Sequence, residues 1–244
     1  MGRTAAALII GNEILSGKVQ DTNTGALARE LRALGIELRR VVVVSDEVPL
    51  IAAELNALRL THDMVFTSGG VGPTHDDVTV EGIALALGRR VVRHPEVEAL
   101  LRDFYGNRCT EDHLHMADVV EGTELYRGED PRWPTMVLGN VYILPGVPEV
   151  FRFKLEGLRP RLRGDEAPFV LRSVYTSLDE GHIKPSIDAV VTRFSDVSIG
   201  SYPRWNDDDH AVRVTFDGRD AARVNEAAEA FRALLPEGSF IRSE

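Results

Sequence analysis

The sequence predicts an α/β protein whose first region is a mostly parallel sheet with helices on both faces, followed by a small α+β domain. Two observations predict this arrangement. Through about residue 160, short apolar runs such as Ala5–Ile10 alternate with segments whose apolar residues recur at helical spacing. Beyond Arg159–Pro168, a stretch rich in Pro, Gly and charge that suits a linker, the pattern is β-α-β-β-α-β, the split βαβ order. We therefore expect two domains, 1–160 and 168–244.

Each element of the first region rests on a local pattern. Ala5–Ile10 is a continuous apolar run, as expected for a strand covered on both faces, and Val41–Val44 is predicted to be a second buried strand. Leu31 and Leu34 continue a helical spacing that starts at Asp21 and stops at Gly35. The other predicted elements are helices at Val48–Leu60, Thr79–Leu87, His94–Asn107 and Glu149–Leu158, strands at Asp63–Thr67 and Asn140–Leu144, and an irregular segment at Ala117–Gly139.

The second region is shorter and has one pattern for each element of the split βαβ order. The predicted strands and helices are, in chain order, Val170–Thr176, the helix Glu180–Phe194, Val197–Tyr202, His210–Phe216, the helix Ala221–Leu235 and Ser239–Arg242. Between two of these strands, Asp207, Asp208 and Asp209 predict a solvated hairpin turn rather than a metal cluster.

Composition excludes several classes of protein. The 244 residues carry 28 Lys+Arg against 38 Asp+Glu, a formal charge of −10, so no basic surface is expected to bind nucleic acid. The apolar runs are far shorter than the roughly 20 residues that a transmembrane helix needs, and the N-terminus lacks a signal-peptide pattern. The single cysteine, Cys109, has no partner for an internal disulfide. We expect a cytoplasmic protein with neither nucleic acid nor a membrane as partner.

The most informative stretch is TSGGVGPTHDDVT, residues 67–79. Three glycines within four positions follow a predicted strand, and a helix opens soon afterwards. Glycine lets the backbone approach a ligand closely, and amides at a helix N-terminus favour an anion. The stretch therefore predicts a turn that holds phosphate, although it is neither the Lys-ended P-loop nor the dinucleotide fingerprint.

Two aspartates, Asp76 and Asp77, stand directly after this turn. Carboxylates beside a phosphate pocket repel the substrate unless a divalent cation lies between them. The alternative is that one of them caps the helix that begins near Thr79. The glycine turn before them favours the metal-binding interpretation.

The carboxyl ends of the other predicted strands carry a second set of polar and glycine residues. The loop after Ile10 supplies Gly11, Glu13, Gly17, Asp21, Thr22 and Asn23, and Asp46 follows the second strand. Open α/β sheets bind ligands at this edge. Capping of the next helix by Asp21 or Thr22 is the structural alternative.

These motifs resemble a known family. GNEIL at 11–15 with QDTN at 20–23, and GGVGPTHDDVT at 69–79, resemble the MoaB/Mog-like molybdopterin-binding family, which includes CinA. NVYILPGVPE at 140–149 and GSYP at 200–203 make the chain most similar to the N-terminal molybdopterin-binding-like domain of eukaryotic-type FAD synthase. The resemblance covers essentially the whole chain and implies a three-layer α/β/α domain.

The resemblance also implies site residues. Two aspartates regarded as essential in the Mog-like branch match Asp46 and Asp77, which we take as catalytic, with Asp76 and Asp77 as metal ligands. The expected substrate-binding residues are Gly11, Glu13, Asp21, Asn23, Ser68, Gly69, Gly70, Gly72, Pro73, Thr74, Thr79 and Gly146. The expected cofactor is a divalent metal, Mg²⁺, Mn²⁺ or Co²⁺.

Three functions remain open at this point. The first is a metal-dependent pyrophosphatase that cleaves FAD, ADP-ribose or a similar dinucleotide, as the CinA and FAD synthase branches imply. The second is a protein of molybdenum cofactor biosynthesis that binds molybdopterin or its adenylated form, with adenylyl-transfer activity. The third is a scaffold that kept the fold and lost catalysis. The expected partners are a small nucleotide or pterin substrate and further copies of the chain, as a dimer in preference to a trimer.

Overall fold

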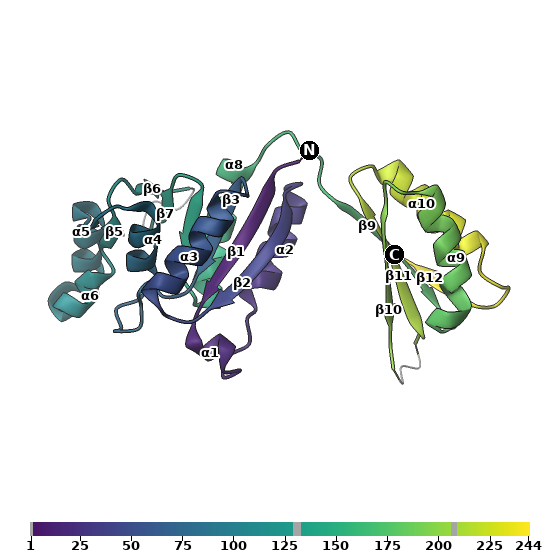
Figure 1. Ribbon diagram of the computed structural model, residues 1–244, viewed down its shortest axis with the longest axis horizontal. Coiled ribbons are helices and arrows are strands. Elements are labelled where there is room, and N and C mark those ends of the chain that lie inside the picture. Colours follow the sequence, from purple (N-terminus) through teal and green to yellow (C-terminus); the bar gives the residue numbers. More distant parts are fainter. Residues whose placement is uncertain (1, 129–132, 206–208) are drawn as a thin grey trace. The chain divides into compact units, whose positions relative to one another are not determined.

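The structure is a computed structural model, and it describes residues 2–128, 133–205 and 209–244 (Figure 1). The chain forms two compact units, Met1–Glu166 and Ala167–Glu244. The first unit extends past residue 160 because Arg3 donates two hydrogen bonds of 2.7 Å to the Glu166 carboxylate. These bonds hold the pKa of Glu166 at about 2. Part of the predicted linker is helical, since α8 spans Arg159–Leu162.

A mostly parallel sheet forms the middle of the first unit, as predicted. Its strand order is β2-β1-β3-β8-β7-β6, in which the first four strands are parallel and β7 runs antiparallel to both of its neighbours, β8 and β6. The strands are β1 (Thr4–Ile10), β2 (Glu37–Val44), β3 (Met64–Ser68), β6 (Glu124–Tyr126), β7 (Thr135–Leu138) and β8 (Val141–Leu144). The carboxyl ends of the four parallel strands therefore lie at one edge.

Helices cover both faces of this sheet, which makes three layers (Figure 1). The helices are α2 (Asn23–Ala33) and α7 (Pro148–Gly157) on one face, and α3 (Val48–Arg59) and α4 (Thr79–Leu87) on the other. Successive residues of a strand point to opposite faces, so β1 contributes to both cores. Ala7 and Ile9 pack with Leu31 of α2, whereas Leu8 packs with Ile51 of α3.

The sequence expectations for two segments with strands in the first unit are wrong. Val41–Val44 belongs to the edge strand β2, and Val41 and Val43 are 41% and 36% exposed, because only β1 flanks this strand. The segment Ala117–Gly139 is not wholly irregular: it holds β6, β7 and β5 (Asp118–Val120), which pairs with β4 (Val91–Arg93). Strands of three or four residues are too short to show a period. Residues 129–132 of this segment lie outside the described residues.

The smaller helices of the first unit fill the connections. They are α1 (Asn12–Leu15), α5 (Pro95–Tyr105), the 3₁₀ turn η1 (Gly106–Arg108) and α6 (Glu111–His115). The sequence predicts a loop where α1 lies and does not predict α6. In the described parts of the chain, the search for a helix long and apolar enough to cross a bilayer found none.

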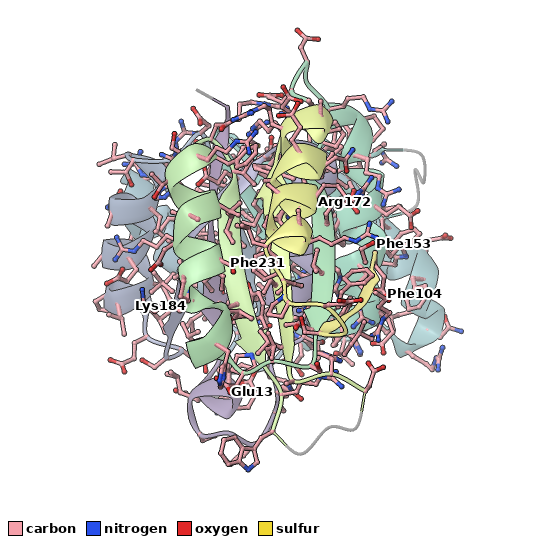
Figure 2. All side chains as sticks on the ribbon, turned by 90° about the vertical axis from the view of Figure 1, so that its right-hand side faces the viewer. Glu13, Phe104, Phe153, Arg172, Lys184 and Phe231 are labelled. Carbon is pink, nitrogen blue, oxygen red and sulfur yellow. The ribbon has the colours of Figure 1, made fainter. Side chains whose placement is uncertain are left out.

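The second unit has the predicted split βαβ order. Its strands β9 (Val170–Thr176), β10 (Ser198–Pro203), β11 (Val212–Gly218) and β12 (Phe240–Ser243) form an antiparallel sheet in the order β10-β11-β9-β12. Helices α9 (Glu180–Arg193) and α10 (Ala221–Ala233) cover one face (Figure 1). Phe231 of α10, labelled in Figure 2, packs against Phe216 of β11 with ring centroids 5.7 Å apart. The predicted hairpin turn at Asp207 and Asp208 lies outside the described residues.

The contact between α3 and α4 predicts whether a substitution of Gly82 stabilises or destabilises the fold. A Cβ added at Gly82 would lie 2.4 Å from Cγ2 and 2.7 Å from Cβ of the fully buried Ile51. We expect Gly82→Ala to lower the free energy of unfolding by about 1–3 kcal/mol, because overpacking outweighs the gain in helix propensity. Urea unfolding followed by circular dichroism measures this change.

Gly25 in α2 is the matched control. A Cβ there would meet only the Arg29 guanidinium, at 3.4 Å. Gly25→Ala is therefore expected to raise stability by up to about 1 kcal/mol. Equal effects of the two substitutions would contradict the packing argument.

Candidate functional site

The loops that follow β1 and β2 are tied together at the carboxyl edge of the sheet. The Gly11 N–H donates to the Val44 carbonyl at 3.1 Å, and the Asn12 N–H donates to Oδ2 of Asp46 at 2.8 Å. Half-buried Asp46 thus orders the first turn of α1. A Cβ on Gly11 would lie 2.4 Å from the Glu13 carboxylate, so glycine leaves room for that side chain (Glu13 is labelled in Figure 2).

Asn23, at the start of α2, joins three of the loops. Its Nδ2 donates to Ser68 Oγ at 3.0 Å and to the Gly146 carbonyl at 2.8 Å. The side chain is buried, and its Oδ1 has no partner among the described residues. Asp21 accepts from the N–H groups of Asn23 and Thr24 at 2.9 and 3.0 Å, and from the Thr24 hydroxyl. Asp21 therefore performs the capping role that the sequence left open.

The turn after β3 requires glycine because two backbones meet there. Gly69 and Gly70 have φ values of +104° and +64°. A Cβ on Gly69 would lie 2.1 Å from the Ile10 carbonyl oxygen. The buried Thr79 hydroxyl donates to the Gly69 carbonyl at 2.8 Å, and the Thr79 N–H donates to the Gly70 carbonyl at 3.0 Å. Thr79 therefore holds the turn from inside.

The amides of this turn are available to an anion. Among the described residues, the N–H groups of Gly70, Val71 and Gly72 have no acceptor. Buried or half-buried amides are normally paired, so consecutive unpaired ones indicate a place for a ligand or water. This is the feature that the glycine pattern predicts.

Asp76 and Asp77 converge on one hydroxyl. Thr74 Oγ1 lies 2.6 Å from Oδ1 of Asp76 and 2.5 Å from Oδ2 of Asp77, and the Thr74 N–H donates to the same Asp77 oxygen at 2.8 Å. The Thr74 hydroxyl lowers the pKa of Asp76. Helix α4 begins after Val78 without a side-chain cap, so neither aspartate has the capping role considered above. Asp77 closes the preceding turn instead.

A cavity of about 360 Å³ adjoins this turn. Its lining includes Thr74 and Asp77 from the predicted set, together with Asp112, His115 and Asp118. His115 Nδ1 lies 3.1 Å from Oδ2 of Asp118. Burial raises the pKa of Asp118, but hydrogen bonds from Arg93 and His115 outweigh this effect and lower it overall.

The sequence patterns did not identify Asp112, His115 and Asp118 as candidate site residues. These residues belong to or border α6 and β5, two very short elements. Helix α6 has a cap that could have located it: the Thr110 side chain accepts from the His113 N–H, and the Thr110 N–H donates to His113 Nδ1. This arrangement is a capping box with histidine in place of the usual Glu or Gln.

The predicted site residues fall into two neighbouring places. A narrow crevice of about 60 Å³ is lined by Glu13, Asp21, Asn23, Ser68, Gly69 and Gly146, whereas Gly72, Pro73, Thr74 and Asp77 line the larger cavity. The other predicted residues line neither of the two: Gly11, Asp46, Gly70, Asp76 and Thr79. Within residues 2–128, 133–205 and 209–244, no group of three or more His, Cys, Asp or Glu side chains gathers in a geometry suited to a metal ion.

The two units match two family profiles. Residues 6–164 match the profile described as "Probable molybdopterin binding domain". Residues 168–244 match the one described as "FAD synthase, middle domain". The boundary between the two matches coincides closely with the division of the structure after Glu166.

Individual relatives agree with these matches. A protein of Archaeoglobus fulgidus is 34% identical over 226 residues, which are 93% of this chain and 95% of that protein. A probable FAD synthase of Caenorhabditis elegans is 28% identical; the match covers 96% of this chain but only 50% of the relative, so this chain spans about half of its length. The crystal structure of CinA from Thermoplasma acidophilum, described as of unknown function, has 31% identity and a TM-score of 0.61, over 66% of this chain and 100% of that one.

Because Asn23 is buried, we expect its replacement by aspartate to make the stability of the protein depend on pH. In Asn23→Asp an acceptor-only carboxylate would face the Gly146 carbonyl. Burial raises the folded-state pKa of this carboxyl above its unfolded value, so the variant is closest to the parent at low pH and loses stability as the pH rises through the folded-state pKa. We expect a loss of about 2–4 kcal/mol at pH 8, measured by denaturant unfolding at pH 5 and pH 8 against the parent at the same pH.

Asn23→Ala is the control, because it removes the same two hydrogen bonds without adding a titratable group. Its loss relative to the parent should be equal at the two pH values. A pH-independent loss in Asn23→Asp as well would show that the site is not buried as described.

Proposed function

The chain belongs to the molybdopterin-binding domain family, and from this premise we propose that it hydrolyses the pyrophosphate bond of a dinucleotide such as FAD or ADP-ribose, with the help of a divalent metal ion. The observation that carries the proposal is the turn after β3. There, amides at Gly70–Gly72 without an acceptor among the described residues stand close in the chain to two convergent carboxylates, Asp76 and Asp77. Of these residues, Val71, Gly72 and Asp77 line the cavity of about 360 Å³. The similarity to FAD synthase over both units supports an FAD-like substrate.

The charge of the cavity supports a cation. Asp77, Glu81, Asp112 and Asp118 all line it, and Arg93 pairs only with the last of these, through a bond of 2.6 Å to Asp118 Oδ1. A pyrophosphate carries negative charge and is repelled by such a lining. Substrate and cation are therefore expected to enter together.

The donor set of the turn fits Mg²⁺, Mn²⁺ or Co²⁺. Mg²⁺ is usually bound through one or two carboxylates together with substrate phosphates and waters. Asp76 and Asp77 would supply the carboxylates, since their oxygens already approach one hydroxyl within 2.6 Å. When bound, the ion would offset the charge that develops on the phosphate oxygens.

The remaining roles fall to groups of the chain. The amides of Gly70–Gly72 would hold phosphate oxygens. His115 is a candidate general base, because Asp118 accepts its Nδ1–H and leaves the lone pair on Nε2. Water attacks one phosphorus, the bridging P–O bond breaks, and the proton of the water passes to His115. The products are two phosphomonoesters.

A second candidate function is the binding of molybdopterin or its adenylated form, with transfer of an adenylyl group. The description of the family matched by residues 6–164 favours it. Both functions need a phosphate site at the same turn, so the geometry is compatible with either. They differ in the reaction: the first function hydrolyses a pyrophosphate bond, whereas the second transfers an adenylyl group.

The deciding experiment is a product-resolved screen of FAD, ADP-ribose, NADH and coenzyme A with Mg²⁺, Mn²⁺ or Co²⁺. Conversion of FAD to FMN and AMP, or of ADP-ribose to AMP and ribose phosphate, is the expected result. A rise in melting temperature with molybdopterin but no hydrolysis of any dinucleotide would favour the second candidate. If the protein neither hydrolyses a dinucleotide nor binds molybdopterin, the third possibility remains, a scaffold that kept the fold and lost catalysis.

Asp77→Asn separates a catalytic role from a structural one. The amide oxygen still accepts from Thr74, so the turn should survive at a cost of at most about 1 kcal/mol. The loss of one negative charge weakens both ion binding and stabilisation of the transition state, so we expect hydrolysis to fall by about 10²–10³. Initial rates and thermal unfolding measure the two effects.

Asp63→Asn is the matched control. Asp63 accepts from the N–H and the hydroxyl of Thr4 at 2.7 and 2.8 Å, the same pair of donors as at Asp77, but at the amino end of the parallel strands. The hydrolytic activity of Asp63→Asn should equal that of the parent. If Asp77→Asn retained activity within about threefold while losing stability, Asp77 would only be a structural residue of the turn.

A further inference from the structure

A polar cavity of about 310 Å³ opens on the sheet of the second unit. One row of directly opposed residues crosses all four strands: Tyr202 of β10, Arg213 of β11, Tyr175 of β9 and Arg242 of β12. All four line the cavity. Their chain neighbours, such as Val214, pack in the core under the helices, so the row lies on the opposite face of the sheet.

The row alternates aromatic rings with guanidinium groups that lie over them. The Arg213 guanidinium carbon is 5.1 Å from the centre of the Tyr202 ring, and that of Arg242 is 3.9 Å from the Tyr175 ring. His210, only 4% exposed in its side chain, packs edge-on against Tyr175. The ring contacts themselves leave the charge of the guanidinium groups in place. Arg242 is paired with carboxylates, since its Nε also donates to Glu244 at 3.1 Å.

Among the described residues that line the cavity, basic side chains outnumber acidic ones, although the chain as a whole is acidic. These lining residues are Arg204, Arg213 and Arg242 against one carboxylate, Asp209. Arg242 occupies both oxygens of that carboxylate, at 2.7 and 2.8 Å, and lowers the pKa of Asp209 to about 2. Among the described residues, no carboxylate pairs with Arg213, whose one described interaction is the Tyr202 ring.

We propose that this cavity binds the phosphate group of a small phosphomonoester, with Arg213 as its principal ligand. A guanidinium group presents parallel N–H donors that match two phosphate oxygens. Holding like charges together costs free energy, and an anion offsets that cost. The small volume and the net charge of −10 favour a small anion over a nucleic acid.

The test is calorimetric titration of the full chain with inorganic phosphate and with AMP, at constant ionic strength and with EDTA. EDTA removes divalent ions, and without them the carboxylates that line the cavity of the first unit should repel phosphate. The Arg213 variants then show whether the remaining binding belongs to the second unit. We expect saturable binding of one anion per chain. Arg213→Gln should weaken it at least tenfold, with the fold checked by circular dichroism.

Arg172→Gln is the control, since it removes the same charge from the same sheet. Arg172, labelled in Figure 2, donates to Asn225 of α10 at 2.8 Å. It does not line the cavity. Its affinity should stay within twofold of the parent. If Arg213→Gln does not fold, Arg213→Lys keeps the charge without the planar fork, and binding should weaken by about three- to tenfold.

Three results would overturn the proposal. One is no saturable binding to the parent chain. Another is equal weakening by Arg172→Gln and Arg213→Gln, which would indicate a general charge effect. The third is Arg213-dependent binding of a single-stranded oligonucleotide more tightly than AMP, which would assign the face to nucleic acid.

Discussion

The first unit depends on the close approach of two strand ends, where the Gly69 backbone meets the Ile10 carbonyl. Any side chain at that position would place Cβ 2.1 Å from the carbonyl oxygen. Because this contact is so close, the loops after β1 and β3 lie within reach of the same side chains. Asn23 can then bridge Ser68 and Gly146. Directly after this contact, the N–H groups of Gly70–Gly72 have no acceptor among the described residues, and they form the candidate phosphate site.

Much of this was predictable from the sequence, because it rests on residue types with one physical use. Glycine at 69 and 70 is required by positive φ, and the apolar run Ala5–Ile10 has the pattern of a strand buried on both faces. Other features depend on tertiary position. The same apolar pattern in Val41–Val44 belongs to an edge strand, since a run of valines does not record how many neighbours the strand has.

Some residues of the candidate site could likewise be predicted from the sequence, and others could not. Gly72, Thr74 and Asp77 are identified by their motif, and the cavity beside them includes all three. His115 and Asp118 reach that cavity from elements of five and three residues, which are too short for a hydrophobic period to emerge. The roles of Asp21 and Asp77 also depend on tertiary geometry, because a cap and a ligand use the same residue types and differ only in which amide lies within 3 Å.

The net charge of the whole chain does not indicate which anions each unit can bind. The total of −10 bears on long polyanions, whose many charges meet the field of the whole protein. A single phosphate responds to groups a few ångströms away, where the screening that weakens distant charges has little effect. Under the function proposed for the first unit, the carboxylates at its cavity require a cation to accompany the substrate, whereas the second unit presents guanidinium groups stacked on tyrosines. On these two proposals, one acidic chain offers a phosphate two chemically different environments, one that depends on a cation and one that does not.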